Sequence, residues 1–205
     1  MYLVEACVEN LEAAIEAEKN GAHRIELCAD LANDGLTPSD DLLISVFEKV
    51  KIPIRAMIRP RTGNFWYSKS EIKQMKSSIL FCKKLRIEGV VFGLLMKDNT
   101  VDVENTNALA KLAFPLKVTF HKAIDETPDI FEAVEILAKI NEISAVLTTG
   151  KMPTAMEGNQ ILNQLVQKFG NKIDIIAAGK ITPHNLPELH KLIKGEWYHG
   201  RRIVG

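Results

Sequence analysis

Two Glu-x-Cys pairs are the residues of this chain whose types and spacing most directly suggest chemistry. Glu5 and Cys7 lie in "YLVEACV", and Glu26 and Cys28 lie in "HRIELC". If both segments are strands, the two cysteines occupy equivalent phases on neighbouring strands, roughly 5 Å apart in the hydrogen-bonding direction. Met57 falls on the next such segment. Two thiolates and a thioether are soft donors of the kind that suit Cu(I).

A second set of side chains could bind and convert a small anionic molecule. Arg59 and Arg61 in "MIRPRTGNF" could grip a carboxylate or a phosphate through paired hydrogen bonds. His121 in "VTFHKAID" could act as general acid or base and change its protonation near neutral pH, with Glu26 orienting it. This hypothesis describes an enzyme whose reaction the sequence does not identify. Its candidate residues are Glu26, Arg59 and His121 as catalytic groups and Arg61, Thr119 and Thr148 as ligand-binding groups.

Each of these residues also has a purely structural interpretation. Free cysteine is among the most buried residue types and packs as a small hydrophobe, which is the interpretation we prefer for Cys82. Glu26 and Arg59 could form an internal ion pair with no functional role. A third hypothesis is a regulatory or interaction protein that has kept the scaffold and lost the site.

The elements that must position these residues alternate along the chain. Short apolar runs that predict strands are separated by segments of helical period. Ser68 and Glu71 form a predicted capping box, and Thr127 followed by Pro128 predicts another helix start. The predicted strands are residues 2–8, 23–28, 52–59, 89–95, 116–121, 144–149, 172–178 and 197–204.

Eight strands and seven helices in strict β-then-α order predict parallel strands joined by right-handed crossovers. An open doubly wound sheet would satisfy the same order, but eight repeats is the number that closes a barrel. We therefore predict an α/β fold with one domain over residues 1–205, a short TIM (β/α)8-type barrel. The last predicted strand ends at the end of the sequence, so we expect the eighth helix to be missing and a partner subunit to cover that flank in a homodimer.

The side of each strand that carries only apolar residues should face the helices, which leaves the other side for the barrel interior. Active sites of such barrels lie at the mouth formed by the C-terminal ends of the strands. We therefore expect Glu26, Arg59 and His121 to lie within reach of one small ligand. The full set predicted to point inward is Glu5, Cys7, Glu26, Cys28, Arg55, Met57, Arg59, Thr119, His121, Val146 and Thr148.

Composition argues against some classes of partner. The chain has 26 basic and 26 acidic residues, so its zero net charge offers no electrostatic footprint for nucleic acid or an anionic membrane. No apolar run approaches the roughly 20 residues that a membrane span needs. Three cysteines without a dense spacing indicate free thiols in a reducing compartment. We expect a cytoplasmic protein whose partners are a copper ion or a small molecule.

Several long motifs closely resemble the CutC family of copper homeostasis proteins. They are "VEACVENLEAAIEAEKNGAHRIELCADLANDGLTPS", "MIRPRTGNFWYSKSEIKQMK", "GVVFGLL", "VTFHKAID" and "LTTG…AMEG", which follow in order from residue 3 to about residue 158. The resemblance implies a cytoplasmic TIM barrel, dimeric or higher, that is linked to copper handling. It also implies that Cys7 and Cys28 bind Cu(I), and that the barrel mouth is lined by Glu26, Arg59, Arg61, Thr119 and His121.

The chain departs from the family pattern near its C-terminal end. Where the family usually has a Pro-Gly-Gly-Gly run after the seventh strand, this chain reads "AAGKIT" and keeps only Gly179. The last strand typically carries Glu-x-His, whereas here Trp197 lies two residues before His199 and the nearest glutamate is Glu196. The resemblance therefore does not imply that the loop after the seventh strand binds an anion in this chain.

Overall fold

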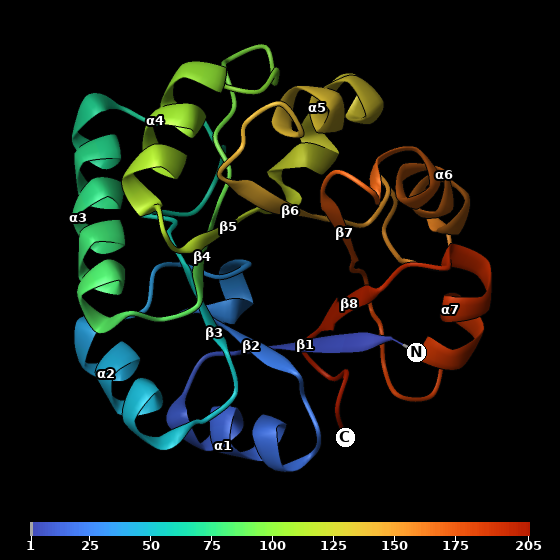
Figure 1. The fold of residues 1–205 in the computed structure, drawn as a ribbon, viewed down its shortest axis with the longest axis horizontal. Helices are drawn as coiled ribbons and strands as arrows, with labels where there is room; N and C mark the ends of the chain where they lie inside the picture. Colours follow the sequence, from blue (N-terminus) through green and yellow to red (C-terminus); the bar gives the residue numbers. More distant parts are fainter. Residues whose placement is uncertain (1) are drawn as a thin grey trace.

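Eight parallel strands close into a barrel in the order in which they occur along the chain, in a computed structural model that describes residues 2–205 (Figure 1). This arrangement confirms the predicted TIM-type barrel. The strands are β1 (Leu3–Val8), β2 (Arg24–Leu27), β3 (Ile54–Met57), β4 (Gly89–Phe92), β5 (Lys117–Phe120), β6 (Ile143–Thr148), β7 (Asp174–Ala177) and β8 (Trp197–Gly200).

The helices form an outer ring around the strands (Figure 1). None of those within residues 2–205 has the length and apolarity required for a membrane span. The α-helices are α1 (Leu11–Lys19), α2 (Asp40–Lys49), α3 (Lys69–Leu85), α4 (Val103–Ala113), α5 (Ile130–Leu137), α6 (Asn159–Phe169) and α7 (Leu186–Ile193), and two short 3-10 helices are η1 (Leu31–Asn33) and η2 (Lys122–Glu126).

The predicted helix starts have different outcomes. The capping box of Ser68 and Glu71 is present at the start of α3. The helix predicted to start at Thr127 begins later, because the Asp129 carboxylate accepts hydrogen bonds from the backbone N–H groups of Phe131 and Glu132. The hydroxyl of Thr127 instead donates to a carbonyl of η2.

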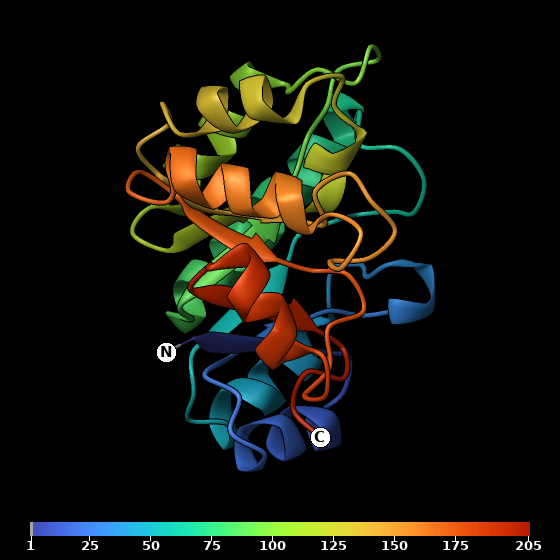
Figure 2. The same ribbon diagram turned by 90° about the vertical axis from the view of Figure 1, so that its right-hand side faces the viewer.

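The strand register places the chemistry-bearing residues of the first, second and eighth strands side by side. Cys7 on β1 is the partner of Glu26 on β2, and Glu5 on β1 is the partner of His199 on β8. Since the barrel closes by pairing β1 with β8, residues 194 positions apart in the sequence become neighbours. In Figure 2, η1 and the loops after β3 and β6 extend on the side away from the N-terminus, at the C-terminal ends of the strands.

The phase predicted for the sixth strand is wrong. Ala145 and Leu147 pack inside the barrel, whereas Val146 belongs to the core between strands and helices. Thr148 shares the phase of Val146 and therefore points away from the barrel centre. The reason is that a strand buried on both faces has apolar residues in both phases, so period-2 alternation does not identify the inner face.

The chain itself covers part of the flank beside β8. Tyr198 is fully buried, and its hydroxyl contacts the ring of His190 and the backbone of Gly195. Ile203 is also buried, in the segment that follows β8, and no helix follows β8 within residues 2–205. A cavity of about 350 Å³ remains between β1, α1 and the segment that follows β8, and the homodimer stays a prediction.

Candidate functional site

The two inward-facing cysteines lie in contact near the C-terminal ends of β1 and β2. The Sγ atoms of Cys7 and Cys28 are 3.8 Å apart, and both side chains are buried in a cluster with Met57 and Val91. Two sulfurs bound at about 2.3 Å to one tetrahedral ion would be separated by about the same distance. The predicted orientation of the cysteines is confirmed, and their spacing fits a shared metal ion.

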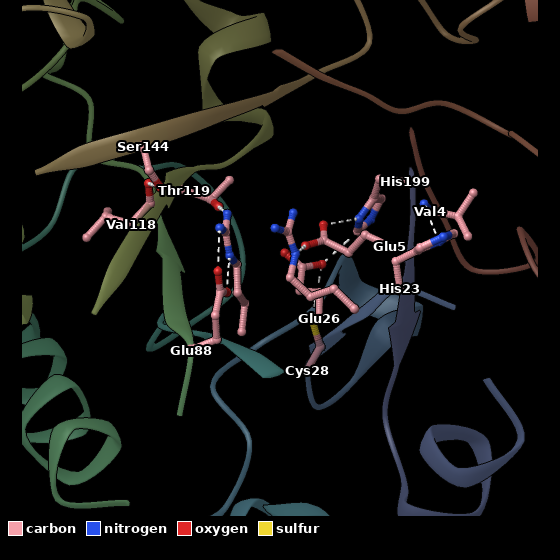
Figure 3. Close-up of polar contacts among 12 residues, drawn as sticks. Val4, Glu5, His23, Glu26, Cys28, Glu88, Val118, Thr119, Ser144 and His199 are labelled. Atoms are coloured by element: carbon pink, nitrogen blue, oxygen red, sulfur yellow. Dashed lines mark hydrogen bonds and ion pairs between the residues drawn. The ribbon is translucent and has the colours of Figure 1, made fainter. Parts of the chain in front are cut away.

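Two further donors complete this cluster. Ligand atoms of Cys7, Glu26 and His199 all lie within 4.8 Å of one another. Glu26 Oε2 is 3.6 Å from His199 Nε2 and 3.7 Å from Cys28 Sγ, while Glu26 Oε1 has no hydrogen-bond partner among residues 2–205. Figure 3 shows Glu26, Cys28 and His199 converging in the barrel interior. We call Cys7, Cys28, Glu26 and His199 the metal cluster.

Glu5 and Arg24 fix the orientation of the histidine in this cluster. His199 Nδ1 lies 2.8 Å from Glu5 Oε1, and Arg24 Nε donates to Glu5 Oε2 at 2.5 Å. Burial opposes ionisation of Glu5, but the charge of Arg24 and the contact with His199 lower its pKa to about 2. Glu5 therefore holds Nδ1, and Nε2 points toward Glu26. A carboxylate that binds the second nitrogen of a histidine in this way commonly supports histidines that ligate metals.

The contact between the two cysteines shifts their pKa values in opposite directions. The hydrogen bond from Cys28 lowers the pKa of Cys7 well below its ordinary value, and the same contact raises that of Cys28. Burial and the neighbouring Cys7 raise the pKa of Glu26 well above its usual range. Burial disfavours charge on His199, but Glu26, Cys7 and Glu5 raise its pKa. Cys7 is thus the cysteine of this site that loses its proton more readily.

Glu26, Arg59 and His121 line one cavity of about 1190 Å³, as the sequence analysis expects. Glu26 and Arg59 form no ion pair, however. The Arg59 guanidinium instead donates to the backbone carbonyls of Asn33, Gly35 and Gly63 at 3.1 to 3.2 Å. The arginine therefore holds the loops after β2 and β3 together at the edge of the cavity.

His121 does not have the protonation behaviour that the sequence suggests. Its Nδ1 accepts a hydrogen bond from the backbone N–H of Ala123 at 3.2 Å, and its ring lies 5.0 Å from that of Phe65. Burial, with the nearby charge of Arg59, lowers the pKa of His121 to about 3. The prediction that His121 changes its protonation near neutral pH is wrong, because its imidazole is buried away from water and lies near the positive charge of Arg59.

Two of the predicted ligand-binding residues lie outside this cavity. Arg61 pairs with Glu71 at 2.5 Å and serves to hold the loop after β3. Thr119 does point inward, but it accepts a hydrogen bond from Arg55, which is paired with Glu88. Figure 3 shows Thr119 and Glu88 in a second polar group that is separate from the metal cluster.

Thr148, the third predicted ligand-binding residue, holds a loop instead of facing the cavity. Its hydroxyl donates to Asp125 at 2.5 Å and accepts from the backbone N–H of Gly150 at 2.9 Å. We expect Thr148→Val to lower the free energy of unfolding by about 1–3 kcal/mol, because it leaves the buried N–H of Gly150 without its acceptor and removes one of the hydrogen bonds to Asp125. Thr106→Val is the matched control, since the buried Thr106 hydroxyl has no partner among residues 2–205. Urea denaturation would contradict this assignment if the two variants lost equal stability.

His199 is the residue of this site that the sequence analysis missed. The sequence gives only a weak indication that His199 belongs to the site, because Trp197 occupies the position where the family pattern has glutamate. The carboxylate that contacts His199 is supplied by Glu5 from the neighbouring strand. Closure of the barrel brings this carboxylate and His199 together.

Comparisons with known proteins agree with this architecture. A model of the CutC family matches residues 2–203. The copper homeostasis protein cutC homologue of Homo sapiens is 40% identical over 188 residues, covering 92% of this chain and 68% of the human protein. The homologue of Dictyostelium discoideum is 37% identical and covers 95% of this chain and 80% of its own length.

Solved structures are similar over the same extent. The crystal structure of the CutC protein from Streptococcus agalactiae superposes with a TM-score of 0.92 at 30% identity, covering 99% of this chain and all of that one. Phosphoribosylanthranilate isomerase from Thermotoga maritima superposes with a TM-score of 0.62 at 12% identity, over 97% of this chain and 87% of that one, which shows the barrel fold alone.

Proposed function

Because the chain belongs to the CutC family, we propose that it is a copper homeostasis protein that binds Cu(I) through Cys7 and Cys28 inside the barrel. The contact between the two sulfurs is the observation that carries this proposal. Cu(I) is a soft ion that prefers thiolate and thioether donors. Two sulfurs from adjacent strands with Met57 packed against them form such an environment.

The protonation of the cysteines fits capture of a cation. Metal ligation requires a thiolate, and the contact with Cys28 lowers the pKa of Cys7, which favours Cys7 as the first ligand. Binding of the ion to both sulfurs releases the proton of Cys28, so uptake is coupled to proton release. His199 Nε2 and Glu26 lie close enough to serve as additional donors.

The surroundings of the cluster support a protected copper site. Cys7 is only 6% exposed, Cys28 is fully buried, and both line the cavity that opens at the barrel mouth. The three cysteines are free thiols, which suits a reducing compartment, and we place the protein in the cytoplasm on that ground. Copper would enter through the mouth as a cargo ion.

Anaerobic Cu(I) titration in competition with the chelator bicinchoninate tests this function. We expect one Cu(I) per chain for the wild type, and a loss of affinity of at least about 100-fold for Cys7→Ser and for Cys28→Ser, since first ligands matter more than their supporting partners. Cys82→Ala is the matched control, because Cys82 is a buried cysteine of α3 in the core cluster that packs strands against helices. We expect its stoichiometry and affinity to equal those of the wild type.

Unchanged Cu(I) affinity in both cysteine variants would contradict the proposal. Circular dichroism and thermal unfolding of each variant show whether a loss of binding reflects a loss of the fold. A wild-type chain that binds Zn²⁺ under the same conditions but no Cu(I) would likewise exclude the assigned ion while leaving the cluster as a metal site.

A further inference from the structure

The cavity at the barrel mouth is far larger than a metal ion requires. Its volume of about 1190 Å³ slightly exceeds the range typical of small-molecule sites, which is about 300–1000 Å³. The metal cluster forms only part of its lining. The remainder includes Arg59, Phe65 and His121. These residues could form a second binding site that does not involve the metal cluster.

His121 presents a buried hydrogen-bond donor that no group among residues 2–205 satisfies. Because Nδ1 accepts from the N–H of Ala123, it carries no proton, and the single proton of the neutral ring is on Nε2. That Nε2–H has no partner among residues 2–205, although the residue is only 4% exposed. A buried donor without an acceptor is costly, so an acceptor atom from a ligand would be strongly favoured. Gly93 permits this ring position, because a side chain there would overlap Nδ1.

Arg59 supplies a positive charge that no carboxylate balances. Its partners at Nη1 and Nη2 are backbone carbonyls, its Nε has no partner among residues 2–205, and the residue is 5% exposed. The guanidinium lies 5.1 Å from the ring of Phe65, on which His121 also packs. Buried charges are normally paired. The cation and the free N–H therefore flank the same aromatic ring at the edge of the cavity.

The rim of the cavity adds further positive charge. Lys122, Lys180 and Arg202 line it and form no ion pair within residues 2–205, whereas Arg201 is paired with Asp34 at 3.5 Å. A cleft lined mainly by one sign of charge concentrates ligands of the opposite sign. The rim therefore favours the approach of anions.

Two further acidic side chains on the rim, besides the paired Asp34, do not reverse this balance. Asp125 accepts hydrogen bonds from Thr148, Thr149 and the backbone N–H of Lys151, so its charge is already well compensated. Glu126 is exposed at the rim, where it offsets one of the lysines.

We propose that the barrel mouth binds a small organic anion, with a carboxylate or phosphate oxygen accepting the Nε2–H of His121 beside the charge of Arg59. The walls contributed by Phe65, Leu147 and Ile181 suit the carbon skeleton of such a ligand. This site is independent of the proposed copper function, because it uses none of the residues of the metal cluster.

Calorimetric titration of the metal-free chain with malonate, inorganic phosphate and malonamide tests the proposal. We expect malonate or phosphate to bind, and malonamide, which has the size of malonate without its charge, to bind at least 10-fold more weakly. His121→Phe keeps an aromatic ring against Phe65 and removes the N–H donor. It should weaken anion binding by about 10-fold or more, the effect of losing one hydrogen bond to a charged group. The matched control His184→Gln changes an exposed histidine outside the cavity and should bind as the wild type does.

Several results would overturn this inference. Absence of binding of both anions at 10 mM, equal binding of malonate and malonamide, or equal anion affinity of the His121→Phe variant would each exclude it. Anion binding that is lost in Cys7→Ser but kept in His121→Phe would place the anion at the metal cluster instead. Anion binding retained in Cys7→Ser, with Cu(I) binding lost, would support two independent sites. A preference for phosphate over malonate, or the reverse, identifies the anionic group of the ligand.

Discussion

Replacing Arg24 with methionine is expected to lower the free energy of unfolding by about 3–5 kcal/mol, the cost of breaking a buried ion pair from one side. Arg24 and its partner Glu5 are 3% and 1% exposed, and their contact is 2.5 Å. The arginine also lies 3.8 Å above the ring of Trp197. Methionine fills part of the volume but leaves the Glu5 carboxylate with His199 as its only hydrogen-bonding side chain.

Urea denaturation at pH 7 measures this loss. Lys139→Met is the matched control, because Lys139 pairs with Glu135 at 3.5 Å on an exposed helix face, where ion pairs contribute little. Adding Glu5→Leu to Arg24→Met should restore part of the lost stability, since it removes the buried carboxylate that has lost its arginine, while His199 Nδ1 loses its partner. A loss below about 1 kcal/mol in the single variant would show that this pair does not hold the barrel interior together.

The stability of the wild-type chain is expected to fall between pH 7 and pH 5 by about 2 kcal/mol more than that of the His121→Phe variant. In the folded chain the pKa of His121 is lowered to about 3, whereas an unfolded chain binds this proton at about pH 6.5. Between these values the unfolded chain binds more protons, so stability rises with pH. The contribution of neutral His121 is therefore fully present above about pH 6.5 and is lost progressively as the pH falls toward 3.

Urea denaturation curves of both proteins at pH 7, 6 and 5 give this difference. The slope with pH is the measured quantity, because the variant also loses the acceptor of the Ala123 N–H and is destabilised at every pH. His184→Gln, at an exposed histidine, should show the wild-type slope. Parallel pH profiles for wild type and His121→Phe would mean that His121 titrates alike in folded and unfolded chains.

Much of the fold and part of the site follow from the sequence by itself. The strict alternation of short apolar runs with helical segments identifies a parallel barrel, because each strand must be covered by a helix and eight repeats close the sheet. In the strands that carry the two Glu-x-Cys pairs, one face holds glutamate and cysteine and the other holds only apolar residues. The inward direction of Cys7 and Cys28 can therefore be predicted from the sequence. The capping box at Ser68 is readable for a similar reason, since its hydrogen bonds span only three residues.

Other features were decided only by the tertiary structure. β6 is apolar in both phases, so its inner face depends on how β5 and β7 pair with it, and Thr148 lies outside the barrel centre as a result. His199 joins the metal cluster only because closure brings β8 against β1, where Glu5 contacts its ring. Arg59 donates hydrogen bonds to backbone carbonyls of the loops after β2 and β3, and the conformations of these loops set the positions of the carbonyls. Local patterns report on contacts a few residues apart, whereas ring closure and loop packing join residues that are distant along the chain.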